Sequence, residues 1–433
     1  MTFSAQLWPL AVALTVAAVG LALLRKPDAL KVWLVIGAMV SLGTVGWTAG
    51  QRPAHAASLP LTALLPLAAF ASLLGQAVHR RQCGGWLVSF LGLGLSLGVL
   101  TAEPALAAFC LVAVLAVVAA ALLLAPSREP SSGLWGIGTL GLGALMAAGS
   151  LMTGPPVSSL AWALACATAL PLVPLHKGFV AALTILPANL PGFLAVALPV
   201  IGFHGLLTVL PLVPPAIADA LGALALAGVA YGSLRAFTQS RAASVVSYGG
   251  AAFYCILWWY LCSTRTAPAH TVVYLSAVGL ATGGLLLAWH QLRARYGEID
   301  LRALSGLARP MPRFAVVLSL LALAAIGLPP FGVYAGMLGM LLAPSFTWSS
   351  ALPIILLGWL AAAWYLFALV QRLLFGAHRP EYRHEDLRGP EWASLALFVV
   401  FLIALGIMPD RWFDPGATPL TRTVVMGAPS WSR

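Results

Sequence analysis

The run PALAAFCLVAVLAVVAAALLLA, residues 104–125, contains no charged side chain and decides the fold class. About 20 apolar residues in a helix cross the hydrocarbon core of a bilayer, whereas a barrel strand needs about ten alternating residues. The run is therefore predicted to be a membrane-spanning helix. Across all 433 residues, 61% are hydrophobic and 8% are charged. A soluble domain carries roughly 25% charged residues, so the composition excludes a soluble enzyme, a nucleic-acid binder and a disordered chain.

Dividing the chain at charges, prolines and short polar turns predicts about fourteen transmembrane helices in an all-α integral membrane protein. The predicted spans are 7–24, 31–49, 59–78, 84–101, 104–125, 134–152, 158–175, 191–210, 215–236, 244–262, 268–290, 312–343, 351–374 and 391–408. The first span lacks a signal-peptide cleavage pattern and is expected to be retained. Segment 176–190 follows its neighbour without a charge break, and 312–343 is too long for one crossing.

The Lys and Arg residues indicate an orientation. Cytoplasmic loops of membrane proteins collect positive charge, and this chain has a net charge of +11. With the first connection inside, 18 of the 23 basic residues fall on the inner side. Only Arg52, Arg265, Arg411, Arg422 and Arg433 stay outside. We therefore predict a multi-pass protein of a bacterial-type inner (cytoplasmic) membrane with both termini outside, and its charge indicates no nucleic-acid partner.

Prolines interrupt two of the predicted spans. Pro171 and Pro174 end the span 158–175, and Pro329 and Pro330 break the span 312–343. Each broken helix is the fourth in a block of five, and two consecutive five-helix blocks have opposite orientation. Broken helices at matching places in inverted repeats are typical of an ion or substrate route at mid-membrane. The alternative is that these prolines merely kink packed helices.

This symmetry suggests a division of the chain. The predicted parts are an N-terminal three-helix segment (1–83), a first repeat (84–210), a second repeat (211–375), and an inner charged loop with the last helix and a short outer tail (376–433).

Four segments carry a resemblance to one known family. They are PLVPLH (171–176), DLRALSGLARPMP (300–312), GLPPFGVYAG (327–336), and the segment from Tyr231-Gly232 through Gln239 to Tyr248. His290 also precedes the second segment much as a histidine of that family does. The segments resemble the antiporter-like membrane subunits of respiratory complex I, a family that also supplies subunits to Mrp sodium/proton antiporters and membrane-bound hydrogenases. The resemblance covers roughly 85–375 and implies fourteen spans.

The resemblance also implies a proton route along charged residues buried at mid-membrane, and this chain departs from that pattern. The positions that hold lysine, or lysine or glutamate, in the family hold Ala169, Val200, Ala243, Tyr274 and Met337 here. Arg241 stands at an aspartate position, and His270 matches a histidine. The family also has a buried glutamate on the fifth helix. Glu103 lies at the membrane edge, too shallow for that position, and a matching depth points to Leu111 or Val112, which are apolar. A proton route needs groups that titrate and hold water, so the sequence predicts a degenerate or rerouted path.

Several polar residues remain as candidates for such a path. His204 lies one helical turn beyond Val200, and Asp219 is expected at a similar depth, so the two form a candidate pair. The other candidates are His176, Lys177, His290, His270, Tyr248, Tyr274 and Glu103. A buried histidine satisfied by a backbone carbonyl, or a snorkelling cation, is the structural alternative at these positions.

The sequence contains no catalytic or metal-binding motif. Gly136, Gly138 and Gly141 match a dinucleotide-binding pattern, but they lie inside a predicted span with no strand before it, where close helix packing explains them better. We therefore expect no catalytic, cofactor-binding or metal-binding site. Its five cysteines lie singly in apolar runs and are expected to be buried thiols. The predicted role is a membrane subunit of a multi-subunit, ion-gradient-coupled and redox-driven complex that contacts other membrane subunits and the lipid bilayer. The charged segment 378–391 is either a solvated loop or a dock for a peripheral subunit. The alternatives for the whole chain are a membrane partner of an inorganic-carbon uptake complex, a non-conducting scaffold, and a stand-alone secondary transporter.

Overall fold

The computed structural model describes residues 7–51, 59–125, 130–187, 189–297, 305–343, 351–376 and 385–407. These residues form sixteen α-helices, two short 3₁₀ turns and no strand. The helices are α1 (Trp8–Ala22), α2 (Pro27–Gln51), α3 (Leu59–Leu74), α4 (Cys83–Thr101), α5 (Pro104–Leu124), α6 (Pro130–Ser150), α7 (Val157–Ala169), α8 (Lys177–Ile185), α9 (Leu190–Val209), α10 (Pro215–Thr238), α11 (Ala242–Thr264), α12 (Ala269–Tyr296), α13 (Pro312–Ile326), α14 (Gly332–Leu341), α15 (Leu352–Leu374) and α16 (Gly389–Ile407). The 3₁₀ turns are η3 (Arg80–Gln82) and η4 (Leu210–Leu212).

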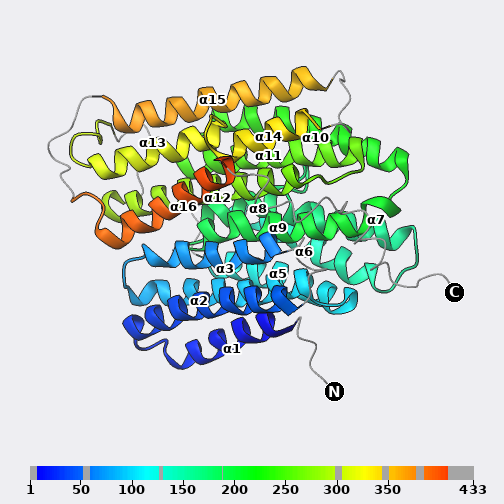
Figure 1. The fold of residues 1–433 in the computed structure, drawn as a ribbon, viewed down its shortest axis with the longest axis horizontal. Coiled ribbons are helices and arrows are strands. Elements are labelled where there is room, and N and C mark those ends of the chain that lie inside the picture. Colours follow the sequence, from blue (N-terminus) through cyan, green and yellow to red (C-terminus); the bar gives the residue numbers. More distant parts are fainter. Residues whose placement is uncertain are drawn as a thin grey trace.

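The helices run side by side along one direction, as a bundle that crosses a bilayer requires (Figure 1). Within the described part of the chain, ten helices are long and apolar enough to span a membrane, and they are α2, α4, α5, α6, α9, α10, α11, α12, α15 and α16. Shorter apolar helices are α1, α3, α7, α13 and α14. The chain is therefore an all-α, multi-pass membrane protein. Each predicted span overlaps at least one helix, while the count of fourteen crossings and the inverted repeat stay predictions.

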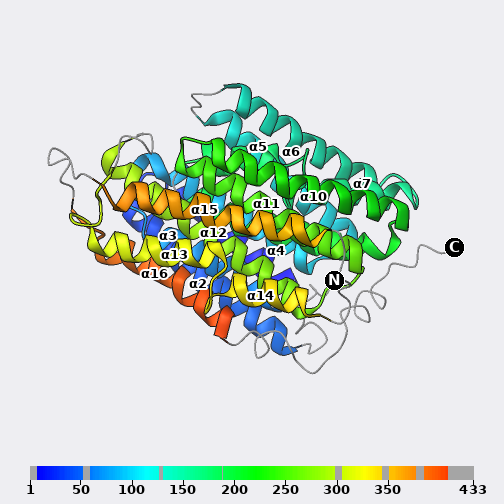
Figure 2. The same cartoon turned by 90° about the horizontal axis from the view of Figure 1, so that it is seen from above.

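The centre of the bundle is formed by α11 and α12. In each of these helices, the most apolar stretch of 18 residues is fully buried. A helix that is hydrophobic on all sides is expected to be buried on all sides. By contrast, a third or less of the residues in the most apolar 18-residue stretch are buried in α2, α6 and α15. Figure 2 shows α5 and α6 at one edge of the bundle and α16 at the opposite edge. The outer helices thus present apolar faces to lipid or to other chains.

Prolines determine where several helices begin and end. Proline is favoured in the first turn of a helix, where the missing N–H costs nothing, and Pro104, Pro215 and Pro312 each begin one. Helix α7 ends at Ala169, six residues before the predicted end of its span, because neither Pro171 nor Pro174 can continue the helical hydrogen bonds. The chain then resumes a helix at α8.

The second break separates α13 from α14. Helix α13 ends at Ile326, and the next residue, Gly327, has a φ of 81° and so adopts the left-handed conformation that glycine tolerates. Pro329 and Pro330 follow, and α14 begins at Gly332. Both predicted helix breaks therefore coincide with interruptions of the helices in the structure.

Polar side chains at one end of the bundle link distant segments. Arg295, at the end of α12, forms an ion pair with Glu391 in the first turn of α16. The Asp386 carboxylate accepts hydrogen bonds from the backbone N–H groups of Arg313 (2.7 Å) and Phe314 (3.1 Å), and it thereby caps α13 from outside the helix. These contacts hold the segment before α16 against α12 and α13.

Candidate functional site

The first candidate site lies at the break between α7 and α8. The His176 side chain is 2% exposed, and its ring lies 5.2 Å from that of Tyr231 on α10 and 6.0 Å from that of Tyr248 on α11, between ring centroids. The two tyrosine rings are 6.4 Å apart. The guanidinium carbon of Arg235 lies 5.3 Å from the centre of the Tyr248 ring. We call these four residues the His176 cluster.

The His176 cluster has an unusual feature, which is that neither imidazole nitrogen has a hydrogen-bond partner in the described part of the chain. Lys177, the next residue, is half-buried. At about 1.5 Å per residue, Tyr231 lies about 10 Å from the end of α10 at Thr238. The cluster is therefore a polar site that begins near one end of the bundle and reaches the first helix break.

Sequence reasoning identified His176, Lys177 and Tyr248 as separate candidates, and the structure places His176 and Tyr248 together. It did not identify Tyr231 and Arg235 as members of a site. The spacing held a signal, because Tyr231 and Arg235 are four residues apart on α10 and so share a face. The spacing does not show which segment packs against that face of α10. In the structure, that segment is the break between α7 and α8.

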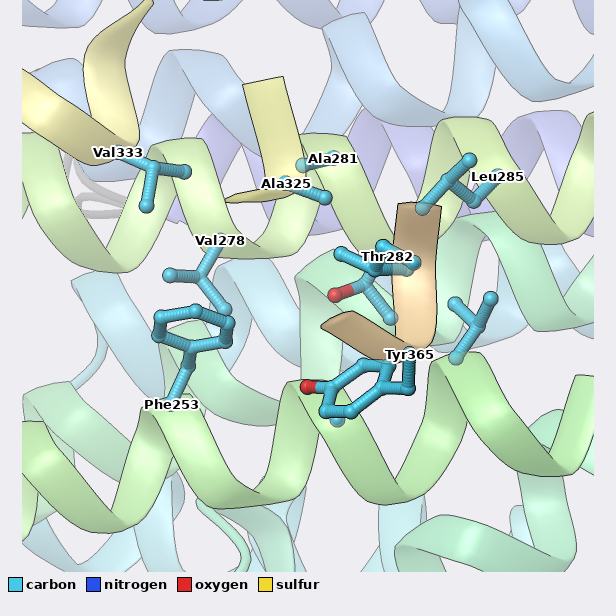
Figure 3. A pocket seen from close by; sticks show the side chains of 12 residues that line it. Phe253, Val278, Ala281, Thr282, Leu285, Ala325, Val333 and Tyr365 are labelled. Carbon is cyan, nitrogen blue, oxygen red and sulfur yellow. The ribbon is translucent and has the colours of Figure 1, made fainter. Parts of the chain in front are cut away.

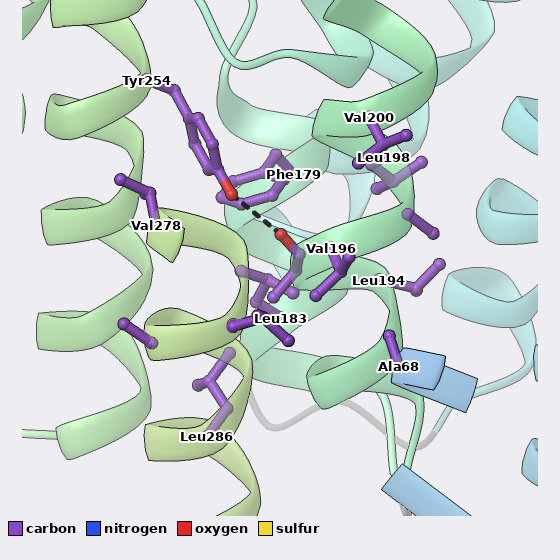
Figure 4. Close-up of a cluster of buried hydrophobic side chains, with 14 of the residues drawn as sticks. Ala68, Phe179, Leu183, Leu194, Val196, Leu198, Val200, Tyr254, Val278 and Leu286 are labelled. Atoms are coloured by element: carbon purple, nitrogen blue, oxygen red, sulfur yellow. Dashed lines mark hydrogen bonds between the residues drawn. The ribbon is translucent and has the colours of Figure 1, made fainter. Parts of the chain in front are cut away.

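The middle of the bundle is apolar at the positions where the family resemblance implies charged residues. Ala169, Val200, Tyr274 and Met337 are all buried, with at most 1% of each residue exposed. Ala243 is half-buried near the start of α11. Figure 4 shows Val200 among packed leucine and valine side chains of α9, with Tyr254 of α11 opposite. No charge or imidazole occupies these positions.

The buried polar side chains at this depth bind backbone carbonyl groups. The Tyr254 hydroxyl donates to the Ala195 carbonyl (3.0 Å), which is the dashed line in Figure 4. The Trp258 indole N–H donates to the Leu170 carbonyl (3.0 Å). The Trp359 indole N–H donates to the Ile326 carbonyl, at the end of α13. Tyrosine and tryptophan thus act here as donors to the backbone.

These three carbonyls share a feature of sequence. Each lies four residues before a proline, namely Pro199, Pro174 or Pro330. Because proline has no N–H, it cannot provide the donor that a continuous helix would supply. An unpaired carbonyl in the hydrocarbon core costs several kcal/mol, so a side chain from a neighbouring helix takes the place of the missing donor.

Two further carbonyl contacts complete the centre of the bundle. The Cys255 thiol lies 3.6 Å from the Pro171 carbonyl, and the Tyr274 hydroxyl donates to the Phe253 carbonyl (3.2 Å). All five cysteines are buried and free, as expected from their apolar surroundings. Tyr274, which was a candidate for the path, is therefore already engaged by the backbone of α11.

A small pocket lies next to the second helix break (Figure 3). It lies between α11, α12 and α15, and one residue each of α13 and α14 completes its wall. The polar side chains among its lining residues are Thr282 of α12 and Tyr365 of α15. Sequence reasoning named neither residue, because a lone threonine and a lone tyrosine on apolar helices carry no motif.

The structure does not bring His204 and Asp219 together. His204 on α9 is half-buried, whereas Asp219 on α10 is exposed, and no ion pair or hydrogen bond joins them. Glu103 is exposed at the residue before α5. His270 packs against α14, because a Cβ atom at Gly339 would lie 2.3 Å from its ring. His290, near the end of α12, is half-buried. The role of each of these candidates stays a prediction.

The charged segment 378–391 is described only from residue 385 onward. Its described part contains Asp386 and Glu391, which bind α13 and α12 as given above. Residues 378–384, which carry the rest of the predicted dock, lie outside the described residues, and the dock stays a prediction. No group of three or more His, Cys, Asp or Glu side chains suited to a metal ion occurs in the described ranges.

The fold resembles chains of solved respiratory complexes. A chain of respiratory complex I from Thermus thermophilus with bound NADH matches with a TM-score of 0.79 at 22% identity, over 97% of this chain and 99% of that one. A chain of the membrane-bound sulfane sulfur reductase, an archaeal respiratory membrane complex, matches with a TM-score of 0.84 at 15% identity, over 95% of this chain and 78% of that one. At these identities the likeness concerns the fold.

Sequence comparison identifies curated relatives. NADH-quinone oxidoreductase subunit 13 of Thermus thermophilus is 30% identical over 275 residues, which are 60% of this chain and 56% of the relative. Subunit M of the Escherichia coli enzyme is 28% identical over 260 residues, which are 58% and 51% of the two chains. The chain thus spans about half the length of these relatives. The family model described as NADH:quinone oxidoreductase/Mrp antiporter, TM, matches residues 107–363. This chain therefore belongs to the NADH:quinone oxidoreductase/Mrp antiporter family of membrane proteins.

Proposed function

We propose that this chain is an antiporter-like membrane subunit of a multi-subunit complex coupled to an ion gradient, and that its own proton route is closed at the middle of the membrane. The first half of this proposal rests on the family and on relatives named as subunits of NADH-quinone oxidoreductase. The proposal includes other membrane subunits as partners and a bacterial-type inner membrane as the location, and the names of these relatives support the partners.

The proposal that the route is closed rests on one observation, which is that the central polar side chains are hydrogen-bonded to the backbone. Proton movement through hydrocarbon needs groups that titrate and hold water. Between α9, α11 and α12 the hydroxyls of Tyr254 and Tyr274 are hydrogen-bonded to carbonyls, and Val200 of α9 is a buried apolar residue. Among the described residues, a proton arriving there would meet hydroxyl groups that already donate to carbonyls, so the barrier across the middle stays high.

The His176 cluster favours a second candidate function, in which the path is rerouted rather than lost. Its imidazole is buried and neither ring nitrogen has a hydrogen-bond partner among the described residues, so both nitrogens are available to a water or to a proton donor. The rings of Tyr231 and Tyr248 lie against it, and the Arg235 guanidinium lies over the Tyr248 ring. If the route is closed, protons reach this cluster from one side of the membrane but go no further. If the route is rerouted, every transported proton passes through this cluster.

A proton-flux measurement separates the two. The purified chain, and separately its complex with native partners, would be reconstituted into vesicles that hold a pH-sensitive dye. A potassium diffusion potential would then drive proton entry. For the closed route, vesicles with the chain alone should acidify no faster than empty vesicles, and His176→Phe or His204→Phe should change nothing. Flux through the chain that either substitution removes would establish a rerouted path and refute the closed one.

Partner identity would be tested by affinity purification from native membranes followed by mass spectrometry. Co-purification of other family subunits with flavin or iron–sulfur proteins is the expected result. A zinc enzyme as the sole partner would instead favour an inorganic-carbon uptake complex. Solute transport by the isolated chain would favour a stand-alone secondary transporter. A stable complex whose ion coupling survives removal of this chain would leave it the role of a scaffold.

A further inference from the structure

The pocket beside the second helix break has few polar groups in an apolar wall (Figure 3). Its lining residues are Val246, Gly249, Gly250 and Phe253 of α11, Val278, Ala281, Thr282 and Leu285 of α12, Ala325 of α13, Val333 of α14, and Tyr365 and Leu366 of α15. The free space is sufficient for about one water molecule. The question is whether such a space would stay empty.

Two hydroxyl groups in this pocket lack partners. Thr282 is 4% exposed and Tyr365 is a buried side chain at 5%, yet neither hydroxyl forms a hydrogen bond with any other described residue. Several other buried hydroxyl groups of the bundle do have a partner. Thr168 and Thr271, for example, donate to the carbonyl three residues earlier, at 2.7 Å in both cases. Tyr254 donates to a carbonyl as well.

Leaving these hydroxyls unpaired would be costly. A buried hydroxyl without a hydrogen bond costs about 1–3 kcal/mol in proteins. Polar groups that are buried in pairs without direct partners are commonly satisfied by an internal water, which needs two to four polar neighbours. Figure 3 shows the two hydroxyl oxygens on the same side of the pocket.

Two adjacent glycines keep the space open. A Cβ atom at Gly249 would lie 2.6 Å from the Tyr365 hydroxyl oxygen, and one at Gly250 would lie 2.9 Å from the Thr282 hydroxyl oxygen. Both distances are shorter than a van der Waals contact, so any larger residue would push against the hydroxyls. The two oxygens therefore approach the same stretch of α11 backbone, where only glycine leaves room for them.

We propose that this pocket is a binding site for a single ordered water molecule, held by the hydroxyl groups of Thr282 and Tyr365. The water joins α12 to α15 beside the α13–α14 break, a link that the protein side chains do not make directly. Both hydroxyls act as donor and acceptor, so they satisfy the water whichever way it is oriented. The site holds whether the chain conducts protons or serves as a scaffold.

The direct test is a cryo-electron microscopy map of the native complex at a resolution that shows ordered waters elsewhere in the membrane domain. We expect a density peak about 2.7–3.2 Å from both oxygens. A map with ordered waters in other buried sites and none in this pocket would overturn the proposal. The same map of the Tyr365→Phe complex should lose the peak.

A stability measurement also tests the site, because the direction of the change in the unfolding midpoint depends on whether water is present. Thr282→Val keeps the shape of the side chain and removes only the hydroxyl. If water occupies the pocket, the substitution removes one of its two side-chain partners and releases it, which leaves the Tyr365 hydroxyl unpaired, and the midpoint of thermal unfolding in detergent should fall. If the pocket is dry, the substitution removes an unpaired buried hydroxyl, and the midpoint should stay the same or rise, which would overturn the proposal.

A double variant provides an internal check. Thr282→Val with Tyr365→Phe should lower the midpoint by less than the sum of the two single changes, because the second loss acts on a water already released. Strict additivity would contradict a shared water. Thr282→Ser, which keeps the hydroxyl, is the matched control and should retain the density peak.

Discussion

Replacing Tyr254 with phenylalanine should destabilise the protein because it removes the side-chain donor to the Ala195 carbonyl. Pro199 has no N–H, so helix α9 cannot supply that donor itself. The ring is fully buried, and phenylalanine fills the same space without the hydroxyl. The change therefore isolates one hydrogen bond and creates almost no cavity.

The expected cost lies between two reference values. Hydrogen bonds between membrane helices contribute about 0.6 kcal/mol on average, because the freed groups usually find other partners. A buried carbonyl left without any partner costs about 1–3 kcal/mol. Since Pro199 denies the Ala195 carbonyl its helical partner, we expect about 1–2 kcal/mol. Tyr274→Phe is the matched control, because the Phe253 carbonyl lies inside the uninterrupted helix α11 and keeps its helical donor.

The assay is unfolding in mixed micelles by titration with sodium dodecyl sulfate, followed by circular dichroism. A double-mutant cycle with Pro199→Ala gives the decisive comparison, because alanine restores an N–H four residues after Ala195. In that background Tyr254→Phe should cost less than half of its cost in the native chain. An equal cost in both backgrounds would show that the hydroxyl does not compensate for the proline, and the reasoning would be refuted.

Two further substitutions test the packing and the polar links in the same assay. Gly336→Ala should cost about 1–3 kcal/mol, because its Cβ would lie 2.6 Å from the Tyr274 backbone and force α14 away from α12, while Gly141→Ala, with open space around it, should cost nothing. Asp386→Ala should cost about 1–2 kcal/mol through loss of the α13 cap, whereas Glu385→Ala removes only a solvent-exposed 3.6 Å ion pair with Arg388 and should fall within about 0.5 kcal/mol of the native chain. An Asp386 variant as stable as its Glu385 control would contradict the capping role.

The closed-route proposal connects these stability effects to function. The side chains that would have to conduct protons, above all Tyr254 and Tyr274, are the ones that complete the hydrogen bonding of interrupted or neighbouring helices. A change that frees Tyr254 for proton transfer would also take away the side-chain donor of the Ala195 carbonyl, which Pro199 cannot replace. Structure and conduction therefore compete for the same hydroxyl groups at the centre of this bundle.

The candidate site was only partly predictable for a related reason. His176 and Tyr248 stand out as polar residues in apolar surroundings, and their types can be read directly from the sequence. Their proximity depends on the packing of α10 and α11 against the α7–α8 break, which brings Tyr231 and Arg235 to the same place. For His204 and Asp219 the depth argument held no information about direction around the helix axis, and no ion pair or hydrogen bond joins their side chains.

The sequence by itself determined the environment and the interruptions of the helices. Long uncharged runs can only be buried in a bilayer as helices, because a helix satisfies its own backbone hydrogen bonds. Pro174, Pro199 and Pro330 likewise determine which carbonyls lose their helical donors, since the consequence of a missing N–H is local.

Only the tertiary structure decided how those losses are compensated. The donors are Trp258, Tyr254 and Trp359. They lie far along the chain from the carbonyls that they bind and from the prolines, at separations between 29 and 88 residues. No local sequence pattern shows which helices will pack together. The same holds for the Thr282–Tyr365 pocket, which exists because two glycines of a third helix leave it open. A missing hydrogen bond is a property of one segment, whereas its replacement depends on which side chain the packing of the whole bundle brings within reach.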